Sequence, residues 1–165
     1  GIKGHDIKKS ISTFPGIRKR LEKLYSTNNI YIYNDFAQSA FRVKSALIAL
    51  KYSFPDHHLK VYFESRATFL QTRSSLQSFS EILPLVDDFV LGKISYSAKI
   101  PADKRVTAKD WQRIFNNNFH YFPTNEKIIN YLSTNLHPGD ILVYFSTGGL
   151  DGFSNLKKVY NHIKP

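Results

Sequence analysis

The chain has 165 residues, of which 42% are hydrophobic and 15% aromatic, and a formal net charge of +10. This composition is that of one folded domain and excludes a disordered chain. No apolar run approaches the about 18 residues of a membrane-spanning helix, the amino-terminal segment lacks the apolar stretch of a signal peptide, and the absence of cysteine excludes disulfides and thiolate metal sites. We therefore expect a cytoplasmic protein with no membrane partner.

The positive charge raises the question of nucleic-acid binding. Basic residues are spread thinly along the chain, and their one cluster, Arg18–Lys23, matches no helix-turn-helix, zinc-finger or RNA-recognition signature. We therefore expect no nucleic-acid partner. Nucleic-acid binding stays an alternative that is supported by the positive charge alone. Anionic small molecules such as nucleotides and sugar phosphates suit the same charge.

The amino-terminal part of the chain leads into a short buried strand. Residues 1–12 are expected to be an approach segment before a Phe-Pro-Gly turn, and Ile17–Tyr25 an edge strand or a short helix. Ile30–Asn34 is rich in β-branched and aromatic residues and predicts a strand. From Ser39, a residue suited to capping, the period changes to that of an amphipathic helix, which ends before Pro55.

Strands and helices then alternate to the end of the chain. Further strands are predicted at Leu59–Phe63, Asp88–Leu91, Phe119–Phe122 and Ile141–Phe145. Helices are predicted over Ser74–Val86, after Thr107, after Thr124 and around Phe153–Ile163, with a long irregular connection over Gly92–Val106. This alternation predicts an α/β fold: a single Rossmann-like domain with a mostly parallel sheet of about five or six strands and helices on both faces.

Three polar loops follow predicted strands: Asp35–Gln38, Glu64–Arg73 and Ser146–Gly152. Because the carboxyl ends of parallel strands share one edge, we expect these loops to converge on a ligand site. Asp35 could accept hydrogen bonds from a ribose diol, or it could be a helix-terminal acid stabilised by the macrodipole. Arg66 could clamp a carboxylate or phosphate, whereas Arg73 is more simply a solvated arginine.

The loop Ser146–Thr147–Gly148–Gly149 offers hydroxyls and backbone N–H groups to an anion, although Gly-Gly turns also serve merely to connect a strand to a helix. The chain has no G-x-x-x-x-G-K-[ST] loop, so a triphosphate would have to be held by another domain. His57 and His58 have no spaced third ligand, and we expect no metal site.

Three motifs in order resemble the C-terminal domain of the Mur ligase family. Residues 32–38, I-Y-N-D-F-A-Q, follow F-x-G-I-x-K-R-x-E over residues 14–22, similar to the family's F-x-G-V-x-R-R-x-E and D-[YF]-[AG]-H-x-P. Residues 63–66, F-E-S-R, resemble the F-E-P-R of the murein peptide ligase branch, and residues 146–152 resemble its S-N-G-G-F-G-G. Gln38 and Ala40 stand where the family usually has His and Pro.

The resemblance implies that residues 14–165 are the substrate-closing domain of a longer enzyme and that residues 1–13 are a linker or the end of a preceding domain. It also implies the use of ATP and magnesium to join L-alanine, or the tripeptide L-Ala-γ-D-Glu-meso-diaminopimelate, to UDP-N-acetylmuramate through an acyl phosphate, in peptidoglycan synthesis or recycling. The amino-terminal and central domains would hold the triphosphate and metal, and the isolated domain would be inactive. The start at Gly1 rather than Met fits such a fragment.

By the same resemblance, Asp35 and Gln38 face the nucleotide, while Arg66, Thr68, Ser146, Thr147, Gly148 and Gly149 bind substrate, and no residue of this domain is catalytic. The alternative is a stand-alone α/β module that binds a nucleotide or another anion without catalysis. An upstream phosphate-binding loop in the same reading frame distinguishes the two.

Overall fold

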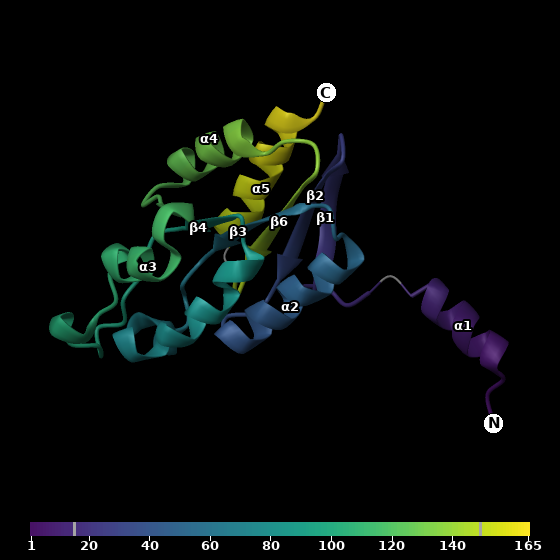
Figure 1. Ribbon diagram of the computed structural model, residues 1–165, viewed down its shortest axis with the longest axis horizontal. Helices are drawn as coiled ribbons and strands as arrows, with labels where there is room; N and C mark the ends of the chain where they lie inside the picture. Colours follow the sequence, from purple (N-terminus) through teal and green to yellow (C-terminus); the bar gives the residue numbers. More distant parts are fainter. Residues whose placement is uncertain (15, 149) are drawn as a thin grey trace.

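The computed structural model describes residues 1–14, 16–148 and 150–165, and its body is one sheet with helices on both faces (Figure 1). The strands are β1 (Glu22–Thr27), β2 (Ile30–Asp35), β3 (His58–Phe63), β4 (Asp88–Leu91), β5 (Phe119–Tyr121) and β6 (Asp140–Phe145). They lie in the order β1-β2-β6-β3-β4-β5, and all neighbours except β1 and β2 are parallel. The predicted α/β fold is confirmed.

The edge strand β1 pairs antiparallel with β2 through a two-residue hairpin turn. Asn28 and Asn29 both have positive φ angles, of 45° and 58°. Asparagine tolerates this conformation, and turns of this kind match the twist of the flanking strands. The alternation of basic and apolar residues before the turn therefore belongs to a strand rather than to a short helix.

The helices cover the two faces in different ways. On one face lie α2 (Ala40–Ser53), α3 (Ala108–Phe115) and the 3₁₀ helix η3 (Gln77–Leu85), and on the other lie α4 (Asn125–Asn135) and α5 (Leu150–Ile163) (Figure 1). The central strand β6 is buried throughout and supplies both layers. Ile141, Val143 and Phe145 pack into the first layer, and Leu142 and Tyr144 into the second, as the two-residue repeat of a strand dictates.

Two of the predicted helix caps form as expected. Ser39 Oγ accepts a hydrogen bond from Arg42 N, 3.5 Å away, and Thr107 forms a capping box with Asp110. Thr124 precedes α4, but its side chain makes no capping hydrogen bond. The Thr124 hydroxyl therefore lies at the start of α4 without capping the helix.

Two predicted segments differ from the structure. The region predicted as one helix over residues 74–86 consists of 3₁₀ turns, η2 (Arg73–Ser75) and η3, and η3 includes Pro84, which cannot donate a helical hydrogen bond. The expected approach segment contains an α-helix, α1 (Gly4–Ser12), that buries no residue and extends away from the body (Figure 1). Its side chains Ile7 and Ile11 are exposed.

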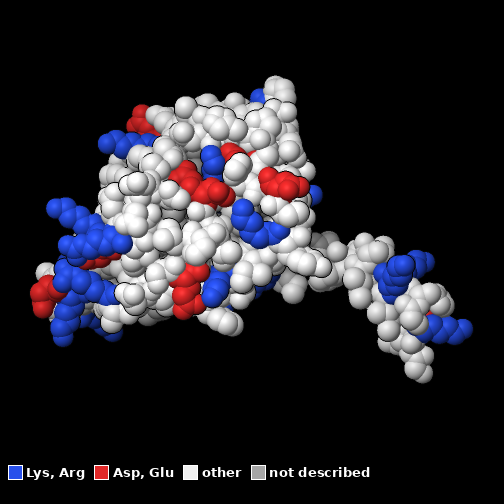
Figure 2. Space-filling view, in the orientation of Figure 1, with Lys and Arg blue, Asp and Glu red and all other residues white. Residues whose placement is uncertain are grey.

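The basic residues are less evenly spread in space than along the chain. Figure 2 shows Lys and Arg gathered at the end of the body opposite α1. In the connection before α3 and in α3 itself, the exposed basic residues include Lys99, Lys104, Lys109 and Arg113. Asp103 and Asp110 lie in the same part of the chain. Sequence spacing concealed this group because it spans the irregular connection before α3 as well as α3 itself.

Candidate functional site at the carboxyl edge of the sheet

The backbones of the three polar loops meet at one edge of the sheet. Ser146 N donates to Asp35 O at 3.1 Å, and Glu64 N donates to Phe145 O at 3.0 Å. These bonds extend the parallel hydrogen bonding between β2 and β6 and between β6 and β3 just past the ends of the strands. The loops after β2, β3 and β6 therefore begin side by side, as expected for parallel strands.

The side chains of these loops, however, point to different faces of the sheet. Asp35 follows Tyr33 by two residues and shares its face, which is covered by α2. Glu64 follows Tyr62 by two residues and shares the opposite face, which is covered by α4 and α5. The expectation of one common site is thus corrected, because strand alternation separates Asp35 from the loop that carries Arg66.

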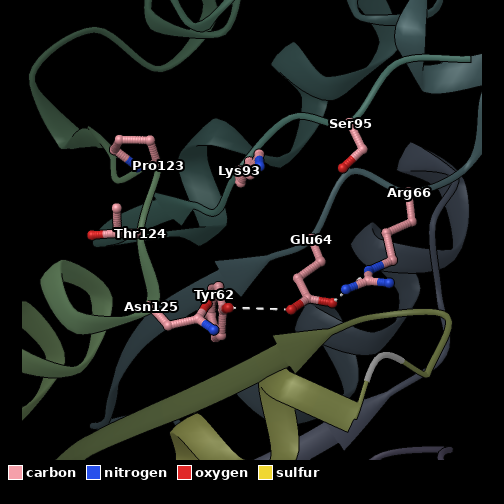
Figure 3. Close-up of a pocket in the computed structure, with 8 residues that line it drawn as sticks. All are labelled: Tyr62, Glu64, Arg66, Lys93, Ser95, Pro123, Thr124 and Asn125. Atoms are coloured by element: carbon pink, nitrogen blue, oxygen red, sulfur yellow. Dashed lines mark hydrogen bonds and ion pairs between the residues drawn. The ribbon is translucent and has the colours of Figure 1, made fainter.

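Glu64 is the centre of a buried hydrogen-bond network on the α4 and α5 face. Its carboxylate, in a residue 7% exposed, accepts from Tyr62 Oη at 3.2 Å, Ser146 Oγ at 2.7 Å and Arg66 Nε at 3.1 Å. Figure 3 shows Tyr62 and Arg66 approaching it from opposite sides. A buried charge is tolerated only when it is paired and hydrogen-bonded, and this one is both.

The tyrosines beneath Glu64 are held in their protonated form. Burial raises the pKa of Tyr62 and of Tyr144, and the negative charge of Glu64 raises both further. The two rings stack with their centroids 4.8 Å apart. Tyr62 therefore remains a hydrogen-bond donor at neutral pH and fixes the orientation of the Glu64 carboxylate.

A pocket of about 440 Å³ opens above this network (Figure 3). It lies where β3 and β4 end and α4 begins, and its lining residues are Tyr62, Glu64, Arg66, Lys93, Ser95, Pro123, Thr124 and Asn125. The Arg66 side chain is 46% exposed, and its Nε bonds Glu64. In the part of the chain that the structure describes, the exposed Lys93 has no ion-pair partner. The pocket can therefore receive an anion.

Ser146 joins this network through its hydroxyl, whereas Thr68, Thr147 and Gly148 do not line the pocket. Ser146 Oγ accepts from Gly148 N at 3.2 Å while donating to Glu64, so it locks the loop after β6 against the loop after β3. Gly148 has a φ of 106°, which favours glycine. Thr68 is exposed at the start of the 3₁₀ helix η1 (Thr68–Gln71) and does not line the pocket. Gly149 lies outside the described residues.

Asp35 uses its carboxylate within the chain. Its Oδ2 accepts from Leu21 N at 2.9 Å and its Oδ1 from Ala37 N at 2.7 Å, with Arg20 Nη1 3.8 Å away. These bonds tie the segment before β1 to the start of α2. Asp35 is 5% exposed, so in this structure it shapes the loop rather than presenting its carboxylate to solvent.

Gln38 and Thr147 meet at a separate hollow of about 410 Å³ on the α2 face, together with Phe36, Ser39, Arg42 and Ala67. Gln38 Nε2 donates to Ala37 O at 3.1 Å, and its Oε1 is buried without a hydrogen-bond partner among the described residues. A buried oxygen without a hydrogen-bond partner costs free energy of folding, and a ligand that donates a hydrogen bond to it would remove that cost. Asp35 lines a further hollow of about 490 Å³ beside Arg20 and Leu21, so the predicted nucleotide-facing and substrate-binding residues border three hollows rather than one.

No group of three His, Asp or Glu side chains in the described ranges is arranged to hold a metal ion. His57 contacts Asn29, and His58 pairs with Asp87, at the other edge of the sheet. The residues present therefore do not fit a magnesium site by themselves. No helix among the described residues is long and apolar enough to cross a membrane.

Glu64 is predicted from the sequence only as part of a polar loop and of a motif, and Lys93 is not among the predicted site residues. A signal for Glu64 was available, because Tyr62 and Glu64 alternate onto one face just as the strand ends. Lys93 lies inside the irregular connection after β4, where no periodicity marks it. Only the pairing of β3 with β4 brings it beside Arg66.

Comparison with known proteins supports a relationship over nearly the whole chain. A UDP-N-acetylmuramate–L-alanine ligase of Desulfitobacterium hafniense is 27% identical over 153 residues, which are 91% of this chain and 34% of the relative. The chain thus spans about a third of the length of the curated relatives that it matches. No protein-family model matches the chain.

Solved structures share the fold. UDP-N-acetylmuramate–alanine ligase of Thermotoga maritima superposes with a TM-score of 0.70 at 15% identity, covering 93% of this chain and 32% of that one. A single domain described as part of a UDP-N-acetylmuramate:L-alanyl-γ-D-glutamyl-meso-diaminopimelate ligase of Haemophilus ducreyi superposes with a TM-score of 0.62 at 18% identity. It covers 87% of this chain and 99% of that one, so the fold exists as a separate unit.

Proposed function

Starting from a chain that is related to the Mur ligases in sequence and has the fold of their C-terminal domain, we propose that it closes the active site of an ATP-dependent, amide-forming ligase. The enzyme joins the amine of L-alanine, or of a peptide that begins with it, to UDP-N-acetylmuramate in peptidoglycan synthesis or recycling. It works in the cytoplasm, as the cysteine-free sequence suggested.

The observation that carries this proposal is the position of Arg66. Its guanidinium is anchored through Nε to the buried Glu64 carboxylate, which leaves its remaining N–H groups toward a polar pocket. A guanidinium held in this way is pre-organised to bind a carboxylate in two-pronged fashion. L-alanine carries its carboxylate beside the amine, and the tripeptide carries its carboxylates on its second and third residues, so we assign Arg66 to orient either amine substrate through a carboxylate.

The rest of the ligase lies outside these residues. ATP supplies the phosphoryl group that activates the sugar carboxylate, and its magnesium and triphosphate would be held by the central domain, because this chain has neither a phosphate-binding loop nor a metal cluster among its described residues. Gln38 and Thr147, at the hollow on the α2 face, would face the nucleotide, next to the loop that Asp35 shapes.

We propose a domain boundary just after α1. Its apolar side chains Ile7 and Ile11 are exposed and find no partner in the body, whereas amphipathic helices of folded proteins bury that stripe. We assign residues 1–13 to the end of a preceding domain, which would cover them, and residues 14–165 to the closing domain.

The test is a phosphate-release assay on the full-length enzyme with ATP, UDP-N-acetylmuramate and each candidate amine. Arg66→Ala is expected to raise KM for the amine by about 10- to 100-fold, the loss of a charge-assisted hydrogen bond of about 1.5–3 kcal/mol, and to leave KM for ATP nearly unchanged. The 165-residue chain alone should release no phosphate.

The matched control is Arg113→Ala, because the Arg113 side chain is 78% exposed on α3 and pairs only with Asp110 among the described residues. It should alter neither KM. Equal effects of Arg66→Ala on the KM values for ATP and amine would remove the assignment of Arg66. A full-length protein that releases no phosphate with any amine would favour the non-catalytic binding module.

A further inference from the structure

Helix α2 carries a second apolar stripe on the side that faces away from the sheet. Its other side is buried in the first layer of the core. On the outer side Phe41, Ile48 and Tyr52 are 79%, 48% and 91% exposed, and Ser45 lies between Phe41 and Ile48. These four residues, here the α2 stripe, follow one another at intervals of four, three and four, which places them on one side of the helix. A continuous exposed apolar stripe of this kind marks an interaction surface.

The part of the chain that the structure describes leaves the α2 stripe uncovered. Helix α1 extends away from the body rather than over α2 (Figure 1). Helical spacing places two lysines on one flank of the stripe, and both are paired within the chain, Lys44 with Glu81 at 2.9 Å and Lys51 with Asp87 at 3.7 Å. The stripe is therefore apolar along its centre, and the charges on this flank are compensated.

The other flank of the α2 stripe borders the hollow of about 490 Å³. Its lining residues are Arg20, Leu21, Asp35, Phe41, Arg42, Ser45, Ala46 and Ala49. The side chains that α2 contributes beyond Phe41 and Arg42 are small, which leaves space between the helix and the segment before β1. The hollow can therefore receive a large side chain.

The hollow and the most exposed aromatic residue of the α2 stripe lie at opposite ends of the same helix. The hollow adjoins Phe41 in the first turn of α2, whereas Tyr52 is in the last turn, eleven residues or about 16 Å further along. One copy of the chain therefore cannot place its own Tyr52 in its own hollow. A second copy related by a two-fold axis can, because two antiparallel α2 helices bring each Tyr52 beside Phe41 of the other copy.

The order of the residues in the α2 stripe is complementary to itself in this antiparallel arrangement. When Phe41 lies opposite Tyr52 of the second copy, Ser45 lies opposite Ile48. An aromatic ring then meets an aromatic ring, and a small side chain meets a branched one. A two-fold interface requires one surface patch to fit a second copy of itself, and the α2 stripe meets this requirement.

We propose that the α2 stripe is the interface of a two-fold dimer of this chain, in which Tyr52 of each copy enters the hollow beside Phe41 of the other. This inference goes beyond the proposed function and does not depend on it. Each copy would bury two aromatic side chains of about 150–250 Å² each, roughly half of the about 800 Å² per partner of a standard interface. We therefore expect a weak dimer, with a Kd above about 1 µM.

The interface would adjoin the hollow at Gln38. Arg42 lines that hollow as well as the one that would receive Tyr52. Tyr52 of one copy would thus lie next to a side chain that borders the nucleotide-facing hollow of the other.

The test is sedimentation equilibrium of the full-length enzyme and of the 165-residue chain at concentrations between about 5 and 500 µM. The mean mass is expected to rise with concentration toward that of two copies. Tyr52→Lys and Phe41→Lys should each raise the Kd of the dimer at least about tenfold, because each places a charge in an apolar contact. Both side chains are exposed, so the variants should melt at the temperature of the unmodified chain.

The matched control is Ile11→Lys, which places the same charge at an exposed apolar position of α1. It should leave the Kd of the dimer unchanged. The comparison with Tyr52→Lys therefore separates association through the α2 stripe from association through the apolar side of α1.

A disulfide cross-link tests the antiparallel register. The chain contains no cysteine, so introduced cysteines can pair only with each other. Copies carrying Ser45→Cys, mixed with copies carrying Ile48→Cys and mildly oxidised, should form a linked dimer faster than either variant alone. Equal rates in the mixture and in the separate variants would contradict the register and overturn the proposed interface.

Three further results would overturn the inference. The first is a monomer at every concentration, and the second is a dimer that Ile11→Lys disrupts and Tyr52→Lys leaves intact. The third is a full-length enzyme that stays monomeric while the 165-residue chain dimerises, which would assign the α2 stripe to contact with another domain. Phosphate release by the same preparations tests the proposed function separately.

Discussion

The amino-terminal and carboxyl-terminal ends of the parallel strands, here the amino edge and the carboxyl edge of the sheet, both carry charged residues. The two edges differ in how far these charges pair with one another. At the amino edge a hollow of about 510 Å³ is lined by charged groups that pair with one another: Lys60 with Asp140 at 3.0 Å, and His120 with Asp88 at 3.2 Å. At the carboxyl edge Asp35 and Glu64 are both hydrogen-bonded within the chain, but in the pocket above Glu64 the charges of Arg66 and Lys93 together exceed that of Glu64. The number of charges in a hollow therefore does not mark a binding site, whereas charge without an internal partner does.

The largest expected effect is the loss of stability caused by a substitution that breaks the ion pair at the amino edge. Asp140→Ala would leave the Lys60 ammonium, whose side chain is 15% exposed, without its carboxylate, and would also remove the acceptor for His137 N. Loss of one partner of a buried pair costs about 3–5 kcal/mol, and we expect a decrease of this size in the free energy of unfolding. Urea denaturation of the 165-residue chain measures it.

Lys44→Ala is the control for that measurement, because it removes the exposed pair between Lys44 and Glu81, at 2.9 Å. Exposed pairs contribute about 0–1 kcal/mol, so this variant should scarcely change stability. Equal costs for Asp140→Ala and Lys44→Ala would show that the amino edge is not stabilised by its internal pairing.

A smaller effect is expected at the carboxyl edge. Glu64→Gln keeps the size of the side chain but removes the charge that orients Arg66. We expect KM for the amine substrate of the full-length enzyme to rise about tenfold, equivalent to about 1.4 kcal/mol, while KM for ATP stays within twofold. A variant that loses stability as Asp140→Ala does, yet binds the amine normally, would assign Glu64 to the fold and not to the site.

The smallest expected effects are on the pH dependence of stability. They come from two carboxyl groups, those of Asp88 and Asp110, whose pKa values are shifted in opposite directions. Burial raises the pKa of Asp88, although the Tyr131 hydroxyl, His120 and Lys60 act against it. Burial would also raise the pKa of Asp110, but hydrogen bonds from Thr107 and the charge of Arg73 outweigh it and lower the pKa. Asp88 therefore contributes stability below its usual pKa of about 3.9, and this is lost as the pH rises through the raised value.

Asp110 behaves in the reverse way, since its contribution is present above the usual pKa and is lost as the pH falls through the lowered value. As the pH rises from 3 to 7, Asp88→Asn should gain stability relative to the unmodified chain and Asp110→Asn should lose it. Denaturant titrations at several pH values measure both slopes. Slopes of the same sign would contradict the assigned environments.

Much of the fold could be predicted because periodicity and caps are local. The strand at Asp88–Leu91 has the predicted bounds, and Ser39 and Thr107 cap the helices expected of them. The 3₁₀ geometry before β4 could not be predicted, because Leu76, Phe79 and Ile82 repeat at a spacing that fits an α-helix and a 3₁₀ helix alike. Helix α1 was missed because nothing in the body packs against it.

The candidate site was predicted less completely, for a geometric reason. Sequence order places polar residues after strands, which identified the loops that carry Arg66 and Ser146. The face on which each side chain lies depends on where its strand ends, and one residue more or less exchanges the faces. Asp35 was grouped with Arg66 for that reason, and Lys93 was overlooked because its neighbour in space lies 27 residues away in sequence, at Arg66.

The central place of β6 also constrains how the protein is made. β2 and β3 each pair with β6 and not with each other, yet β6 is the last strand among the described residues. During translation the earlier strands can form only two separate half-sheets, each with a row of unpaired backbone N–H and C=O groups where β6 later pairs. The six-stranded sheet can form only after residues 140–145 leave the ribosome. A chain truncated before that point would expose two unpaired strand edges, and we expect it to aggregate.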